Sequence, residues 1–158
     1  MEFRDLKKQY AALKNDIDRQ VDEVIASSRF IGGSKVSELE EKLAAYVGVK
    51  HCVTCGNGTD ALELALMAWG IGEGDAVFVP DFTFFSSGEV VAILGATPVF
   101  VDVEEDTFNM DASSLEKAIA RVIADGNLRP SVVVPVDLFG LPANFPEIRK
   151  VADKYGLK

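Results

Sequence analysis

The sequence predicts an α/β fold of three layers, with a mostly parallel sheet covered by helices on both faces. Strand-like and helical segments alternate along most of the chain, which is typical of parallel strands connected by helices. The strand-like segments are continuous apolar runs rather than alternating ones, and such runs indicate burial on both faces. We therefore expect strands at residues 50–55, 76–80, 97–103 and 132–136.

Helices are predicted where apolar residues recur at spacings of three and four and where capping residues mark the ends. Residues 7–28 carry one narrow apolar stripe, which must pack on its own domain or on a second subunit. Apolar residues cover almost the whole surface of 59–69, so we expect that helix to be deeply buried. Other helices are expected at 37–47 with a Ser37–Glu40 capping box, at 85–94, at 115–124 with Ser113 or Ser114 as cap, and from Asn144 to about residue 155.

The composition is that of a globular protein, with 48% hydrophobic and 26% charged residues among 158. A formal net charge of −9 argues against nucleic acid as a partner. The sequence holds no apolar run of 18 residues and does not open on a basic segment leading into an apolar one. We expect a cytoplasmic protein with no membrane partner.

Cys52 and Cys55 have the Cys-x-x-Cys spacing of redox and metal sites. Residues three apart in a strand point to opposite faces, which separates the two thiols if 50–55 is a strand. The sequence has no second cysteine pair, and His51 is its single histidine. We expect two buried free thiols and no metal site.

The stretch with the clearest chemistry is the turn Gly56-Asn57-Gly58, which leads into a helix. The two glycines can adopt positive φ and leave room for a ligand beside the backbone. A helix start offers unpaired N–H groups and the positive end of the helix dipole, so the turn predicts an anion site, with phosphate as its natural ligand. A helix start capped by Asn57 or Thr59, with no ligand, explains this stretch equally well.

Two familiar phosphate motifs differ from this turn. The Gly-Lys-Ser/Thr that would complete a P-loop is missing. In the dinucleotide motif G-x-G-x-x-G, Ala61 stands at the position of the third glycine, where alanine is permitted. Asp81 stands near the position at which this motif places the acid that binds the ribose. The pattern alone leaves a dinucleotide-binding turn open.

Phe82, Phe84 and Phe85 follow the strand at 76–80. Three rings from one turn cannot all face the core; one of them can stack on a flat ligand, although core packing is the commoner role of such residues. Ligands of parallel sheets bind beyond the carboxyl ends of the strands. We therefore expect the glycine turn, residues 83–84 and residues 137–140 to share one rim.

Several motifs together resemble one family. They are Gly-Asn-Gly-Thr-Asp-Ala-Leu at 56–62, Pro-x-x-Thr-Phe at 80–84, Leu-Gly-Ala-x-Pro-Val-Phe-Val-Asp at 94–102, Pro-Val-x-Leu-Phe-Gly at 135–140 and Arg-Phe-Ile-Gly-Gly at 29–33. This set resembles the DegT/DnrJ/EryC1/StrS family, sugar-nucleotide aminotransferases that use pyridoxal 5′-phosphate (PLP). The resemblance implies part of the large domain of a fold-type-I, aspartate-aminotransferase-like enzyme.

The resemblance also implies roles for particular residues. The cofactor phosphate would be held by the amides of Gly58 and Thr59 with help from the side chains of Asn57, Thr59 or Asp60, and Phe84 would stack on the pyridine ring. The loop with Phe30, Ile31 and Gly33 would lie near the sugar nucleotide. Residues 135–140 would line the site, with Asp137 where many members have His or Ser and Leu141 where many have Gln.

The family's remaining chemistry is expected outside these 158 residues. The acid that pairs with the pyridine nitrogen lies in a motif expected just after Lys158, and the Schiff-base lysine lies further on. We therefore expect an N-terminal segment, inactive alone and without a catalytic residue, that divides into an arm and helix at 1–34 and an incomplete PLP-binding domain at 35–158.

The complete enzyme would be a homodimer that moves an amino group from an amino acid, expected to be glutamate, to a nucleotide-linked keto sugar in cell-surface polysaccharide or amino-sugar biosynthesis. Two alternatives remain at this point. One is a dehydratase of the same family that uses the amine form of the cofactor (PMP) and has histidine in place of the lysine. The other is a small nucleotide-binding α/β module complete at residue 158.

Overall fold

The computed structural model describes residues 4–158, and residues 1–3 of the predicted N-terminal arm lie outside them. The chain forms two compact units, Met1–Thr54 and Cys55–Lys158, and each is described by itself. The first unit extends past the boundary expected at residue 34, and the division of the complete protein into domains stays a prediction.

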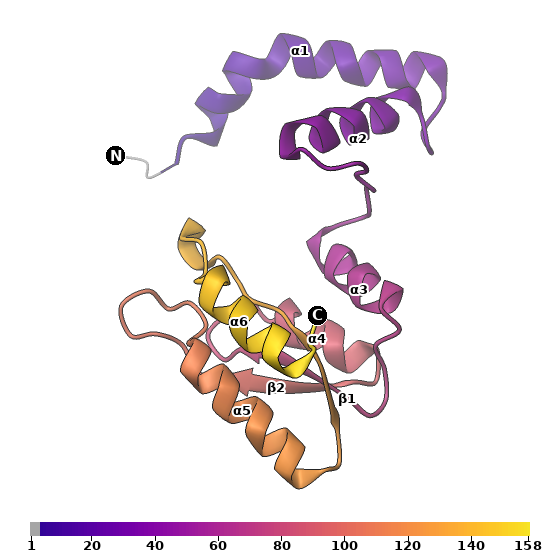
Figure 1. The fold of residues 1–158 in the computed structure, drawn as a ribbon. Helices are drawn as coiled ribbons and strands as arrows, with labels where there is room; N and C mark the ends of the chain where they lie inside the picture. The colour runs from indigo at the N-terminus through magenta and orange to yellow at the C-terminus, as the bar shows by residue number, and fades with distance from the viewer. Residues whose placement is uncertain (1–3) are drawn as a thin grey trace. The chain divides into compact units, whose positions relative to one another are not determined.

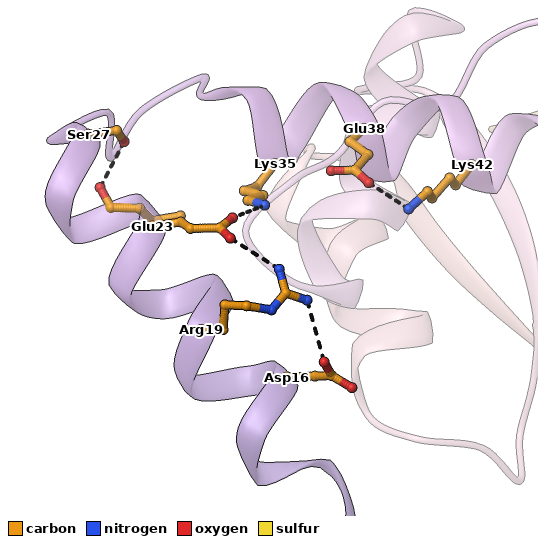
Figure 2. Close-up of polar contacts among 8 residues, drawn as sticks. Asp16, Arg19, Glu23, Ser27, Lys35, Glu38 and Lys42 are labelled. Atoms are coloured by element: carbon orange, nitrogen blue, oxygen red, sulfur yellow. Dashed lines mark hydrogen bonds and ion pairs between the residues drawn. The ribbon is translucent and has the colours of Figure 1, made fainter.

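The first unit consists of helices α1 (Leu6–Ser27) and α2 (Ser34–Val47). The helix predicted at 7–28 is confirmed. The capping box predicted at Ser37 is wrong, because α2 starts one turn earlier, after an extended Gly33. Lys35 of α2 reaches Glu23 of α1 at 2.6 Å, and Arg19 joins the same carboxylate at 3.1 Å (Figure 2).

The strand predicted at 50–55 is also wrong, since these residues form no ladder with another strand of the described chain. The backbone N–H and the hydroxyl of Thr54 instead donate to the Glu40 carboxylate, at 2.9 and 2.8 Å. Both hydrogen bonds lower the pKa of Glu40, and the bond from the backbone N–H has the larger effect. Cys52 is half-buried and free, and Cys55 is free but exposed, so the burial expected for Cys55 is wrong.

The second unit is built on a parallel sheet of strands β1 (Asp75–Pro80), β2 (Thr97–Val101) and β3 (Arg129–Val133), in the order β2-β1-β3. The strands predicted at 76–80 and 97–103 are confirmed with small changes at their ends. The strand predicted at 132–136 begins earlier, because its pairing with β1 starts where Arg129 lies opposite Asp75.

Helices cover both faces of this sheet (Figure 1). On one face α3 (Gly58–Ala68) and α4 (Ser86–Ile93) pack on Val77 and Val79, and on the other α5 (Ala112–Asp125) and α6 (Phe145–Tyr155) pack on Ala76 and Phe78. Successive residues of β1 thus enter opposite cores, which is why the strand is apolar throughout. The predicted three-layer arrangement is confirmed.

Two further expectations about the helices fail and another is confirmed. The N-cap of α5 is Asp111 rather than a serine, because its carboxylate accepts from the first-turn N–H groups of α5. Helix α3 is not deeply buried: Leu66 is enclosed, whereas Met67 is 53% exposed, since the sheet and α4 cover only one side of α3. Asn144 does cap α6, by accepting from the N–H of Glu147.

Within residues 4–158 we find no helix with the length and apolarity needed to cross a bilayer.

Candidate functional site

The candidate site lies in the second unit, at the edge formed by the carboxyl ends of the parallel strands. The segment 81–85 leaves β1 at this edge, and the short helix η1 (Leu138–Gly140) follows β3 there. These two parts of the expected rim are confirmed. The glycine turn is not the end of a strand, but it reaches the segment after β1 through a bond between Thr59 Oγ1 and Ser86 Oγ of 3.0 Å.

The first turn of α3 presents free backbone donors. Asn57 is extended, and its side-chain oxygen accepts from the N–H of Asp60 at 3.0 Å while its carbonyl accepts from Ala61 at 3.2 Å. Among the described residues the N–H groups of Gly58 and Thr59 have no acceptor. The helix dipole adds positive potential at the same point, so this turn is suited to an anion.

The two glycines of the turn provide space rather than unusual backbone angles. Neither Gly56 nor Gly58 has a positive φ, so the turn does not use the left-handed conformation that glycine permits. A Cβ placed on Gly58 would meet no atom within 4 Å, whereas one on Gly56 would lie 2.6 Å from Oδ2 of Asp60. The open side of the turn is therefore at Gly58. The Asp60 carboxylate lies over Gly56 and accepts but cannot donate hydrogen bonds, which makes it the weakest phosphate ligand of the predicted set.

Buried hydroxyl groups link the starts of α3 and α4. Ser86, which is 7% exposed, contacts Thr59, and Ser87, which is 5% exposed, contacts Thr83 at 3.0 Å. Sequence reasoning did not single out Ser86, because its contact with Thr59 spans 27 residues and no local pattern marks it. Ser86 holds the Thr59 side chain beside the free N–H groups.

All three phenylalanines after β1 are exposed, Phe82 to 49%, so the core packing that is the commoner role of such residues is not found. The Phe82 ring packs against Phe108 at 5.3 Å and Phe139 at 6.5 Å between ring centroids. Phe84 is 77% exposed and Phe85 75% exposed. The Phe84 ring is therefore free to cover a flat ligand.

The other predicted residues lie in two further places. Phe30 and Ile31 are exposed in the α1–α2 connection of the first unit, and Gly33 is buried there, where a Cβ would lie 2.7 Å from the Arg29 carbonyl oxygen. In the second unit, the Asp137 carboxylate accepts from the N–H of Ala143 at 2.9 Å. Asp137 is thus used to shape the loop that follows η1.

The comparisons with known proteins agree on one family. A model of the DegT/DnrJ/EryC1/StrS aminotransferase family matches residues 11–158. The chain belongs to this family. It is similar to the UDP-2-acetamido-2-deoxy-3-oxo-D-glucuronate aminotransferase of Pseudomonas aeruginosa, with 44% identity over 99% of this chain and 42% of that protein.

Solved structures of family members share the fold. A DegT DnrJ EryC1 StrS aminotransferase from Brucella abortus is 50% identical, with a TM-score of 0.96 over 99% of this chain and 42% of that one. A sugar aminotransferase from Streptococcus pneumoniae in its PLP form is 36% identical, with a TM-score of 0.73 over 85% of this chain and 33% of that one. The predicted fold class, part of the large domain of a PLP aminotransferase, is confirmed. The chain spans about 42% of the length of the first two of these family members.

Proposed function

We propose that this chain is the N-terminal part of a PLP-dependent aminotransferase that transfers an amino group from an amino acid to a nucleotide-linked keto sugar. The observation that carries the proposal is the start of α3: two free backbone N–H groups and a threonine hydroxyl beside open space, in a chain of an aminotransferase family. PLP binds as a phosphate ester, and this donor set fits a phosphate.

The residues of this chain would bind and orient the cofactor. When bound, PLP supplies an electron sink that stabilises negative charge on the carbon that carries the amino group. The N–H groups of Gly58 and Thr59 would donate to the cofactor phosphate, and the hydroxyl of Thr59 would donate beside them. Asn57 keeps the helix start in place by capping Asp60. The Phe84 ring, which is exposed, would stack on the pyridine ring of the cofactor.

The substrate side of the proposal rests on the resemblance and on the relatives' names. The Pseudomonas relative acts on a UDP-linked oxo sugar, which supports a nucleotide-linked keto sugar as acceptor. We propose glutamate as donor, contacts of Phe30, Ile31 and Gly33 with the nucleotide sugar, and a role in polysaccharide or amino-sugar biosynthesis. The lysine and the acid that complete the chemistry are proposed to lie outside residues 1–158, which leaves this segment inactive alone.

The direct test incubates the full-length protein with PLP, glutamate and UDP- or dTDP-linked keto sugars, and follows products by mass spectrometry. We expect an amino sugar nucleotide and an equal amount of 2-oxoglutarate. Loss of water from the sugar without net amino transfer would assign the protein to the dehydratase branch. Binding of ATP or NAD by the chain, with no PLP binding, would instead support a nucleotide-binding module.

We also propose that the complete enzyme is a homodimer. The stripe of α1 supports this, because its residues Leu13, Ile17, Val21 and Ile25 are between 42% and 57% exposed within the described chain. Light scattering of the full-length protein measures its mass in solution. A monomer that is fully active would contradict the proposal.

Replacing Phe84 by alanine is expected to weaken PLP binding roughly tenfold, because the stacking face is lost. Phe85 is the matched control, since it is equally exposed and adjacent, and its replacement should leave the affinity within about twofold of wild type. Neither change should alter stability, as both rings lie mostly in solvent. The measurement is a titration of the full-length protein followed by cofactor absorbance. Equal losses at the two positions would contradict the stacking role.

A further inference from the structure

A buried amide that the proposed chemistry does not use lies beside the candidate site. Asn109 follows β2 and is 3% exposed. Its Nδ2 donates to the carbonyl oxygens of Leu141 at 3.0 Å and Pro142 at 3.3 Å, and its Oδ1 accepts from the N–H of Leu138 at 3.1 Å. Both ends of one side chain thus hold the loop Leu138–Pro142, which lies 29 to 33 residues further along the chain.

Strained backbone occurs on both sides of this contact. Phe108, next to Asn109, has φ +58°, and Phe139, inside the held loop, has φ +55°. A left-handed conformation is unfavourable for a bulky side chain and persists where the surrounding contacts determine it. Such strain concentrates at functional positions, so these two residues are candidates for a functional constraint.

The strained residues meet through their rings. Phe108 and Phe139 pack at 6.1 Å, and both contact Phe82, so rings from the segments after β1, β2 and β3 form one cluster. Phe82 precedes Phe84 by two residues. The Asn109 bonds and this ring cluster together fix the loop Leu138–Pro142 against the segment that carries the proposed cofactor-stacking ring.

We propose that Asn109 is a positioning residue, which holds the loop Leu138–Pro142 as a wall of the nucleotide-sugar site. This inference rests on the proposed function and on the family resemblance, which implies that residues 135–140 line the site. The amide acts through the loop and touches neither cofactor nor substrate. Its loss should therefore change the KM for the sugar nucleotide more than kcat or the affinity for PLP.

The test compares Asn109→Asp with Asn109→Ala in the full-length enzyme. At about pH 8 the introduced carboxylate still accepts from the Leu138 N–H but faces two carbonyl oxygens, and we expect KM to rise roughly tenfold with kcat within about threefold. Lowering the pH favours the protonated carboxyl group, which can donate again, so the ratio of the KM of Asn109→Asp to that of wild type at the same pH should fall as the pH is lowered. Asn109→Ala should raise KM whatever the pH. Asn127→Asp, at an exposed asparagine, is the matched control and should change neither parameter.

Hydrogen exchange of the Leu138 amide separates this inference from the proposed function. The amide should be protected in wild type and exchange faster in Asn109→Ala. Unchanged protection would show that Asn109 does not hold the loop. Faster exchange with unchanged KM would show that the loop is no wall of the substrate site; either result overturns the inference. A wild-type enzyme without transferase activity would overturn the proposed function and with it the role of the wall, whereas the exchange data would still show whether Asn109 holds the loop.

Discussion

Replacing Asp75 by alanine is expected to lower the free energy of unfolding by about 2 kcal/mol, because it removes a buried carboxylate that accepts from several donors, among them the exposed guanidinium of Arg129. Asp75 is 2% exposed, and its carboxylate accepts from Nη2 of Arg129 at 2.7 Å, from Nε of Arg129 at 2.9 Å and from the N–H of Gly72 at 3.0 Å. The Ser131 hydroxyl completes the set. Without the carboxylate these donors lose their acceptor at the point where β1 and β3 begin to pair. Urea unfolding of wild type and variant, followed by circular dichroism, measures the difference in the free energy of unfolding.

The matched control is Asp153→Ala. Asp153 is 67% exposed and lies 4.0 Å from Arg149, so its loss should change the free energy of unfolding by less than about 0.5 kcal/mol. Similar small changes for Asp75→Ala and Asp153→Ala would show that the Asp75 cluster does not stabilise the sheet.

Acid should remove the Asp75 contribution. Burial raises the pKa of Asp75, but the hydrogen bonds from Ser131, Gly72 and Arg129 together outweigh it and hold the pKa below its ordinary value. A carboxyl group with a lowered folded pKa stabilises the protein above its unfolded pKa of about 3.9, and this stability is lost as the pH falls through the folded value. The stability difference between wild type and Asp75→Asn should therefore be largest near neutral pH and shrink below about pH 4. A difference independent of pH would contradict this assignment.

Replacing Gly58 by aspartate is expected to weaken PLP binding by about 100-fold or more while leaving the fold intact. The added Cβ would meet no atom within 4 Å, and a carboxylate in the first turn of α3 is favourable for the helix itself. The same carboxylate would compete with the phosphate for the free N–H groups of Gly58 and Thr59 and would repel it. Absorbance titration of the full-length variant with PLP measures the affinity.

Two controls assign the effect of Gly58→Asp to phosphate. Gly58→Asn adds a side chain of nearly the same size without charge, and it should weaken binding less than aspartate does. Pyridoxal, which has no phosphate, should bind wild type and both variants with similar affinity. Tight PLP binding by Gly58→Asp would show that the cofactor phosphate does not lie at the start of α3.

The parts of the fold that follow from local chemistry could be predicted from the sequence. The continuous apolar segment at β1 predicted a strand buried on both faces, and the structure places it between two cores. Asn144 predicted the start of α6, and the end expected near residue 155 is confirmed, because a side-chain acceptor and a left-handed glycine, here Gly156, act within one turn of the helix. The free N–H groups after Asn57 follow from the same local rule.

The tertiary structure decided whatever depends on a distant partner. Residues 50–55 have a strand-like composition, but a strand requires a neighbour, and Thr54 bonds to Glu40 instead. Asp111 replaced the predicted serine caps because several side chains near a helix start compete for the same N–H groups. The contacts of Thr59 with Ser86 and of Asn109 with Leu138 join segments 27 and 29 residues apart. No local pattern encodes such contacts, because a hydrogen bond depends on distance in space, and only the packed sheet brings these segments together.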